Sequence, residues 1–168
     1  MLLATRSAGK LRELQPLFAE AGVPVMNLDE AGIPESPHED TLESAETFEA
    51  NALAKARHFF RVSGSPTVAD DSGLEVAALG GKPGVYSKRW SNRQDLSGQA
   101  LDDANNALLL ERLSGCEDRR ARYVCVAAFC DGRSEFVERG EVLGRIAKVA
   151  RGGGGFGYDP YFESDELA

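Results

Sequence analysis

The segment Thr67–Tyr86 most constrains the fold, because a short apolar run meets two adjacent carboxylates and two glycine-rich turns there. Residues 67–69 predict the end of a buried strand, and Asp70 and Asp71 follow at once. Adjacent residues on a strand point to opposite faces, so both acids can serve one site only if the strand ends there. Residues 72–73, Ser and Gly, predict that end. In an α/β protein such a strand end is a common ligand site.

The two neighbouring acids indicate a cation. Close carboxylates repel each other, and a proton or a hard cation such as Mg²⁺ relieves the repulsion. The alternative is a solvated turn, since Asp, Ser and Gly are ordinary loop residues. A second glycine-rich turn at Leu79–Gly84, which carries Lys82, favours the ligand site because a plain connector needs less constrained backbone.

Length and composition restrict the class of protein. The 168 residues fit a single domain, and no run approaches the roughly 20 apolar residues that span a bilayer. A signal-peptide pattern is absent from the N-terminus, so we expect a cytoplasmic protein with no membrane partner. The net charge of -8 argues against nucleic-acid binding, although a few placed cations and a metal can still hold one nucleotide. Three cysteines without a C-x-x-C motif predict buried, reduced thiols.

The N-terminus has the order strand, loop, helix. Residues 1–5 predict a strand, and Leu11, Leu14, Leu17, Phe18 and Ala21 mark a helix that Gly22 ends. The connecting residues 6–10 contain Ser, Gly and Lys. Free N–H groups at a helix start, with a lysine beside them, suit phosphate. The P-loop pattern is absent, and the alternative is an ordinary loop with a surface lysine.

A second helix is predicted over residues 47–60, after a strand at 23–28 and an acidic loop at 29–44. Its apolar face consists of Phe48, Ala52, Ala56 and Phe59. Asn51 and Lys55 are four residues apart and share a face, where an amide and an ammonium suit phosphate oxygens. The alternative is an ordinary amphipathic surface.

The second half of the chain predicts an antiparallel addition to the sheet. A third helix covers 98–113, with Leu101, Ala104 and Leu108 along one stripe. Residues 120–130 form a strongly apolar strand, 131–132 a hairpin turn, and 142–149 a further strand or hairpin. The fold class is therefore α/β with a mixed sheet. Before the third helix, Arg89 stands in a cationic stretch beside aromatics, where it can pair with phosphate or stack on a ring.

A glycine run at 152–155 leads into the Phe-Gly-Tyr-Asp-Pro sequence of residues 156–160. The glycines by themselves are typical of a linker. Aromatic, acidic and turn residues together can instead build a pocket for a flat ring, which stacks on Phe156 or Tyr158 while Asp159 or the backbone reads its edge. Residues 163–168 predict a polar, acidic tail.

Four blocks of this sequence, taken together, resemble the inosine/xanthosine triphosphate pyrophosphatase family. They are residues 4–10 (ATRSAGK), 47–56 (TFEANALAKA), 69–74 with 80–87 (ADDSGL and GGKPGVYS), and 155–160 (GFGYDP). Each block is of limited specificity, but their order and spacing are highly specific and cover nearly the whole chain. The resemblance implies a long mixed sheet flanked by helices, two lobes with a central cleft, and usually a homodimer. It also implies Mg²⁺-dependent hydrolysis of deaminated purine nucleoside triphosphates, such as ITP, dITP and XTP, to the monophosphate and pyrophosphate.

The resemblance assigns roles to individual residues. The triphosphate is expected to bind Thr5, Arg6, Ser7, Ala8, Gly9 and Lys10, together with Asn51, Lys55 and Arg89. Asp71 is expected to be a metal ligand and the catalytic base that prepares the attacking water, with Asp70 supporting it and Glu43 as a further metal ligand. Ser72 would contact the substrate. Phe156 would stack on the purine, and Gly157, Tyr158 and Asp159 would contact it through the same loop.

The chain departs from the family pattern at three places. Ser7 stands where Asn is usual, which removes one amide contact to phosphate, and Leu42 precedes Glu43 where a second acid is common. The family also continues through a lysine, a Ser-His-Arg motif and a final helix, whereas this chain stops at Ala168. We therefore expect a truncated single domain over residues 1–168. Two alternatives remain open: a chain that binds nucleotide or dimerises without turnover, and a Maf-type nucleotide pyrophosphatase, against which Phe-Gly-Tyr-Asp-Pro argues.

Overall fold

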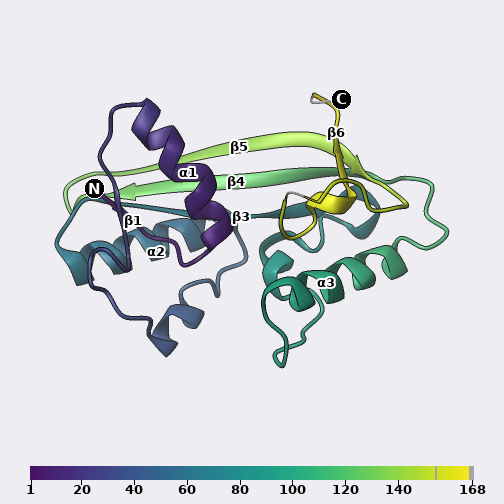
Figure 1. The fold of residues 1–168 in the computed structure, drawn as a ribbon, viewed down its shortest axis with the longest axis horizontal. Coiled ribbons are helices and arrows are strands. Elements are labelled where there is room, and N and C mark those ends of the chain that lie inside the picture. The colour runs from purple at the N-terminus through teal and green to yellow at the C-terminus, as the bar shows by residue number, and fades with distance from the viewer. Residues whose placement is uncertain (154, 167–168) are drawn as a thin grey trace. The chain divides into compact units, whose positions relative to one another are not determined.

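The computed structural model describes residues 1–153 and 155–166, without the side chain of Asp40. A six-stranded sheet organises the chain (Figure 1). Its strands, in spatial order, are β2 (Met26–Asn27), β1 (Leu2–Leu3), β3 (Thr67–Val76), β4 (Arg120–Cys130), β5 (Glu135–Ile146) and β6 (Phe162–Ser164). β1 is parallel to β2 and β3, and β5 is antiparallel to β6. The predicted α/β class with a mixed sheet is confirmed.

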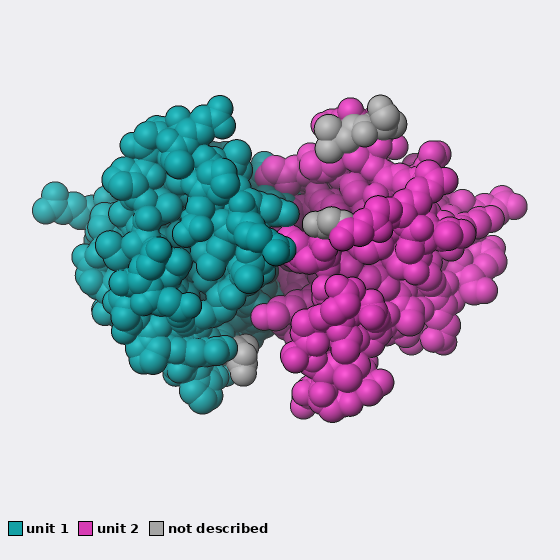
Figure 2. All heavy atoms as spheres, viewed as in Figure 1, with its two compact units in different colours: residues 1–71, 125–139 teal, residues 72–124, 140–168 magenta. Residues whose placement is uncertain are grey.

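The chain divides into two compact units, shown in separate colours in Figure 2. Unit 1 consists of residues 1–71 and 125–139, and unit 2 of residues 72–124 and 140–168. The α-helices α1 (Ala8–Glu20) and α2 (Phe48–Ser63) belong to unit 1, and α3 (Gly98–Arg112) belongs to unit 2. The single domain and the cleft expected from the resemblance stay predictions.

Helix α2 supplies much of the interior of unit 1. Its predicted apolar face of Phe48, Ala52, Ala56 and Phe59 is buried, with exposed fractions of 0–3%. Thr47 caps its first turn by accepting a hydrogen bond from the N–H of Ala50 at 3.2 Å. Helix α1 follows β1 as predicted, but none of its side chains is fully buried. The core of unit 2 joins all its long elements and contains Leu74, Val76, Leu109, Leu113, Ala121, Ile146 and Tyr158.

The predicted end of the strand at Asp70–Gly73 is wrong, because β3 continues to Val76. The reason lies in a distant segment that packs against Gly73. The Ser87 hydroxyl accepts a hydrogen bond from the N–H of Leu74 at 2.8 Å and donates one to the Gly84 carbonyl at 2.6 Å. A Cβ on Gly73 would lie 2.4 Å from the Ser87 Oγ. Gly73 therefore serves close backbone approach within a strand, not a turn.

The predicted apolar stripe of α3 is also wrong, since the buried face lies one residue further on. Leu101, Ala104 and Leu108 are only partly buried, whereas Asn105, Asn106 and Leu109 are buried. Asn105 accepts a hydrogen bond from the Ser91 N–H at 2.8 Å and donates one to the Lys88 carbonyl at 3.1 Å. These bonds satisfy a buried amide that an apolar pattern does not count.

Smaller elements were missed or misjudged. The loop at 29–44 contains a short 3₁₀ helix, Pro37–Thr41, whose start is closed by reciprocal bonds between Ser36 and Glu39. Strand β6 occupies part of the predicted tail, while Gly154 of the glycine run and residues 167–168 lie outside the described residues. Cys130 is buried as expected, but Cys116 is intermediate and Cys125 exposed, and all three thiols are free. Within the described residues, no helix is long and apolar enough to cross a membrane.

Candidate active site

The two carboxylates of β3 are buried and held by different helices of unit 1. Asp70 and Asp71 are 4% and 6% exposed. The Lys10 ammonium of α1 lies 2.5 Å from the Asp70 Oδ2, and the Asn51 amide of α2 donates to the Asp71 Oδ2 at 2.9 Å. Although β3 continues through both residues, the charges of Asp70, Asp71 and Glu43 all act on the Lys10 ammonium, so the three acids lie near one another.

One oxygen of this pair has no partner. The Oδ1 of Asp70 is buried and accepts no hydrogen bond from the described part of the chain. Three other buried polar atoms share this condition, all in unit 2, on Trp90, Ser91 and Asn106. Of these four atoms, the Asp70 Oδ1 is the one that belongs to a carboxylate. A buried anionic oxygen without a donor is costly, and it is the kind of ligand that Mg²⁺ prefers.

The described residues contain no group of three or more His, Cys, Asp or Glu side chains that forms a ready metal centre. Glu43, the third predicted metal ligand, accepts a hydrogen bond from the Lys55 ammonium at 2.7 Å. The residues that fit a divalent cation in this structure are therefore the two acids of β3, with Glu43 held by a lysine.

Lys10 and Asp71 have displaced pKa values for opposite reasons. Burial lowers the pKa of Lys10, but the charge of Asp70 and its hydrogen bond outweigh burial, so the pKa lies above its ordinary value. Burial raises the pKa of Asp71, while the charge of Lys55 and the hydrogen bond from Asn51 counteract part of that rise. A carboxylate with a raised pKa is a better proton acceptor near neutral pH than an ordinary one.

The predicted phosphate loop runs into the first turn of α1. Ser7 caps the helix, and its hydroxyl accepts from the Lys10 N–H at 3.4 Å, while its own N–H donates to the Thr5 Oγ1 at 3.2 Å. Ala8 and Gly9 are the first helical residues, and N–H groups at this position lack intrahelical partners. These N–H groups and Lys10 gather at one helix start.

Arg6 is bound by acids of its own unit. Its guanidinium donates to both oxygens of Glu39 at 3.1 and 2.9 Å and to Asp29 at 3.2 Å. The hydrogen bonds to Glu39 raise the pKa of Arg6 and lower that of Glu39. Glu39, which sequence reasoning left among the solvated acids, therefore orients a predicted substrate residue. The sequence offered one indication that Glu39 is ordered: it lies three residues after Ser36, the spacing of a capping box.

Two further predicted substrate residues, Ser72 and Arg89, lie in unit 2. Ser72 lies within β3 and is partly buried, and the Arg89 guanidinium lies 5.3 Å from the centre of the Tyr86 ring. That distance is within the range of a cation–π contact, so Arg89 stacks on an aromatic ring as one of its two predicted modes.

The aromatic loop at residues 156–159 is held by hydrogen bonds from every neighbouring element of unit 2. Asp159 accepts from the Phe156 N–H and from the Tyr123 hydroxyl, both at 2.9 Å. Asp102 accepts from the Gly157 N–H at 2.9 Å, and Asn106 donates to the Gly157 carbonyl at 2.8 Å. The loop conformation is thus fixed by side chains of β4 and α3.

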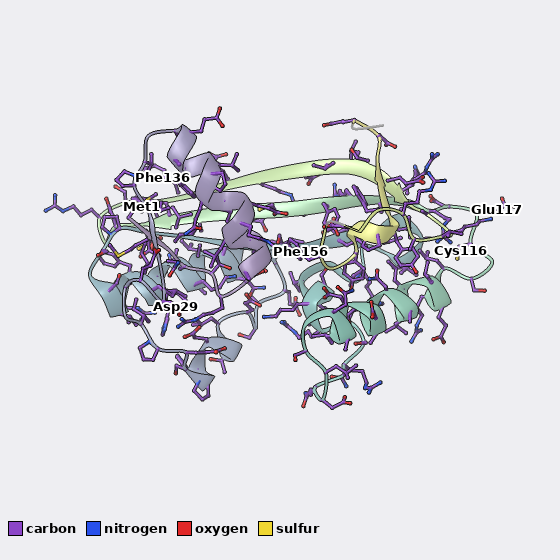
Figure 3. The ribbon with its side chains drawn as sticks, in the orientation of Figure 1. Met1, Asp29, Cys116, Glu117, Phe136 and Phe156 are labelled. Carbon is purple, nitrogen blue, oxygen red and sulfur yellow. The ribbon has the colours of Figure 1, made fainter. Side chains whose placement is uncertain are left out.

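Tyr158 anchors the same loop from inside. It is 4% exposed, and its hydroxyl donates to the Ser87 carbonyl at 2.8 Å. Burial raises its pKa well above the ordinary value, which keeps the hydroxyl a neutral donor. Phe156, labelled in Figure 3, is only partly buried. Tyr158 thus supports the loop, and Phe156 retains a ring surface for stacking.

Sequence reasoning missed the residues that position this loop. Tyr123, Asp102 and Asn106 contribute hydrogen bonds across sequence separations of 36, 55 and 51 residues. No local motif marks them. The one available signal was the presence of a tyrosine within the otherwise apolar strand 120–130, since a buried tyrosine hydroxyl usually has a partner.

Comparisons with known proteins agree with this arrangement. The model of the Ham1 family matches residues 1–168. A dITP/XTP pyrophosphatase of Mycolicibacterium paratuberculosis is 47% identical over 100% of this chain and 80% of its own length, and one of Ralstonia nicotianae is 45% identical over 96% and 79%. Among solved structures, a HAM1 protein of Coxiella burnetii has a TM-score of 0.79 with 34% identity, over 96% of this chain and 79% of its own. A nucleoside-triphosphatase / dITP/XTP pyrophosphatase of Mycobacterium abscessus has a TM-score of 0.75 with 40% identity, over 98% and 83%.

Proposed function

Because this chain belongs to the Ham1 family, we propose that it hydrolyses deaminated purine nucleoside triphosphates, including ITP, dITP and XTP, to the nucleoside monophosphate and pyrophosphate. The observation that carries the proposal is the pair of buried carboxylates on β3, one of which keeps an oxygen without a donor. Relatives named dITP/XTP pyrophosphatase support the substrate class.

The residues around the start of α1 bind the triphosphate. Lys10 and Lys55 carry positive charge, and the first N–H groups of α1 point at an anion placed before the helix. Both ammonium groups are paired with carboxylates, at 2.5 Å for Lys10 and Asp70 and 2.7 Å for Lys55 and Glu43. Phosphate oxygens compete for the same donors, so these pairs hold the lysines in place for the substrate. Thr5 and Ser7 add neutral hydrogen-bonding groups, and Arg6, fixed by Glu39, adds a guanidinium group. Asn51 acts through Asp71, because it is fully buried and its amide already bonds Asp71 and the Ala45 N–H.

Asp71 is the catalytic base and Asp70 supports it. Its raised pKa suits proton transfer from the attacking water, and the Asn51 amide fixes its orientation. Asp70, Asp71 and Glu43 would hold Mg²⁺, and the unpaired Oδ1 of Asp70 supports this choice of metal. Mg²⁺, when bound, polarises phosphoryl oxygens and lowers the pKa of a coordinated water.

The loop at residues 156–159 binds the purine. Phe156 stacks on the ring, and the backbone of Gly157 lines its edge. Asp159 acts through the loop, because both of its oxygens already accept hydrogen bonds from Phe156 and Tyr123. Tyr158 holds the loop from below through Ser87, and Ser72 contacts the substrate from β3.

Product analysis tests this function. The chain is incubated with ITP and Mg²⁺, with ATP and GTP in parallel. Inosine monophosphate and pyrophosphate from ITP, with little product from ATP or GTP, support the proposal. Inosine diphosphate and phosphate, or no turnover in a chain whose fold is verified by circular dichroism, contradict it.

We also propose that the chain acts in the cytoplasm as a homodimer. Unit 1 exposes Leu17, Phe136 and Val137 at 59%, 62% and 37%, and Phe136 is labelled in Figure 3. A contiguous patch of exposed apolar side chains marks an association surface, and these three residues are the candidates for it in unit 1. Sedimentation velocity measures the oligomeric state, and a monomer across the micromolar range contradicts the dimer.

A further inference from the structure

Unit 2 contains a cavity of about 500 Å³ at the end of β5. Its walls are residues 117–120, residues 145–149, Arg151 and Glu163. None of these residues belongs to the site proposed above. The volume is in the range of small-molecule pockets, about 300–1,000 Å³. The cavity therefore has the size of a binding site but no part in the proposed hydrolysis.

The charge of this pocket is opposite to that of the whole chain. Its lining includes five cationic side chains, Arg119, Arg120, Arg145, Lys148 and Arg151, and three acidic ones, Glu117, Asp118 and Glu163. The lining therefore carries an excess of two positive charges, in a chain of net charge -8. Such a local reversal attracts anions to this end of unit 2.

The pocket already holds one carboxylate of its own chain. The Oε2 of Glu163 accepts from the Arg145 Nε at 2.9 Å, and its Oε1 lies 2.7 Å from a terminal nitrogen of Arg151. Two guanidinium groups thus share one anion, and each keeps further N–H donors, since a guanidinium has five. Each arginine contacts a different oxygen of this carboxylate, and charge-assisted hydrogen bonds of this kind also bind phosphate.

Outside the ion pairs of Asp118 and Glu163, the lining has two cations, Arg119 and Lys148, and one acid, Glu117. Arg119 donates to the carbonyls of Ile146, Leu113 and Ala147 at 2.6, 3.3 and 3.1 Å, which fixes its guanidinium and leaves two of five N–H groups. Within the described residues, Arg119 has no carboxylate partner and Lys148 has no ion pair. A fixed guanidinium and a free ammonium beside the Glu163 cluster supply donors for more than one anionic oxygen.

We propose that this pocket binds a small, multiply charged phosphate anion, of which inorganic pyrophosphate is the simplest member. Pyrophosphate presents more oxygens and more negative charge than a single phosphate or a carboxylate, which matches the combined donors of Arg119, Lys148, Arg145 and Arg151. The pocket is separate in its residues from the triphosphate site of unit 1, so its occupation does not depend on hydrolysis.

The test is isothermal titration calorimetry of the full chain with pyrophosphate, without divalent metal. Lys148→Ala with Arg151→Ala removes two exposed cations of the pocket. Arg61→Ala with Arg133→Ala removes two exposed cations of unit 1 and is the matched control. We expect the pocket variant to weaken one pyrophosphate site about tenfold or more, because charge-assisted hydrogen bonds are lost, and the control to bind as the wild type does.

A third variant separates this site from the proposed active site. In Lys10→Ala with Lys55→Ala, pyrophosphate binding to the pocket should persist even if every residue role proposed for unit 1 is wrong. Unchanged pyrophosphate binding in the pocket variant overturns the proposal. Equal competition by sulfate overturns it as well, since it indicates charge attraction without recognition of a polyphosphate. Lys148→Glu, a single exposed change, gives the same test if the double variant has a lowered melting temperature.

Discussion

The carboxylates of β3 and the aromatic loop at residues 156–159 both belong to sequence motifs. They differ in whether every carboxylate oxygen has a hydrogen-bond donor. In unit 1, Asp70 and Asp71 are buried as charged or hydrogen-bonded groups, and one Asp70 oxygen has no donor within the described residues. In unit 2, both oxygens of Asp159 accept hydrogen bonds, from Phe156 and Tyr123. A buried carboxylate that lacks a hydrogen-bond donor is stabilised by binding a cation, whereas one with donors on both oxygens stabilises the local conformation of the chain.

This difference assigns separate duties to acids that look alike in the sequence. Asp71 should matter for turnover, because its neighbours raise and tune the pKa of a proton acceptor. Asp159 should matter for binding, because it fixes the loop that carries Phe156. Each substitution below tests whether turnover and substrate binding depend on different residues.

The largest effect is expected from Asp71→Asn. The amide keeps the size of the side chain but cannot accept a proton, so hydrolysis of ITP should fall about 10³-fold. The melting temperature should change little, since the new amide is close in volume to the carboxylate. Pyrophosphate release measures the loss, and full hydrolysis in this variant would contradict the assignment of the base.

Lys10→Met should have the next largest effect. It removes a phosphate-binding charge and leaves the buried Asp70 carboxylate without its ion-pair partner. We expect kcat/KM to fall about 100-fold through lost charge-assisted contacts and unfolding free energy to fall by about 2–4 kcal/mol.

Adding Asp70→Asn to Lys10→Met separates the two losses. Neutralising the orphaned acid should restore most of the unfolding free energy without restoring turnover, as a double-mutant cycle can measure. Chemical denaturation gives the free energies. Additive losses in the double variant would show that the ion pair does not couple these residues.

Tyr123→Phe should weaken binding more than chemistry. It leaves the Asp159 Oδ1 without the 2.9 Å hydrogen bond that fixes the loop, at a cost of about 1–2 kcal/mol in stability. The KM for ITP should rise several-fold while kcat changes little. Tyr161→Phe is the matched control, because no hydrogen bond of that hydroxyl is present among the described residues. A fall in kcat at constant KM would place Tyr123 in the catalytic step instead.

The smallest effect concerns the pH profile. The charge of Lys55 favours ionised Asp71 and so lowers its pKa, against the rise that burial causes. Lys55→Met should therefore raise this pKa further, and since the base acts as a carboxylate, the acidic limb of kcat/KM should move to higher pH. Lys88→Met, an exposed lysine of unit 2, should leave the limb in place. A shift to lower pH in Lys55→Met would contradict the sign.

The sequence predicted what depends on local pattern. The buried face of α2 and the strand at 120–130 both follow from the spacing of apolar residues. The continuation of β3 through Gly73 does not, because its cause is Ser87, which is distant in sequence and packs against that glycine.

The candidate site divides in the same manner. The acids and lysines of unit 1 could be chosen from motifs, because chemistry requires those residue types. The residues that complete Asp159, hold Gly157 and fix Arg6 could not, since Tyr123, Asn106 and Glu39 do structural work that many residue types perform elsewhere. The buried Asn105 of α3 shows the reason: a polar side chain enters the core when distant backbone groups satisfy it.

The most direct test of the contrast between the two regions is Mg²⁺ binding without nucleotide, measured by isothermal titration calorimetry. Asp70→Asn and Asp159→Asn make the same chemical change in the two motif regions. We expect Asp70→Asn to weaken Mg²⁺ binding about tenfold or more, because a metal ligand loses its charge, and Asp159→Asn to bind Mg²⁺ as the wild type does. Equal losses of Mg²⁺ affinity in both variants, or a loss in Asp159→Asn only, would contradict the assignment of Asp70 to metal binding and of Asp159 to the structure of the loop.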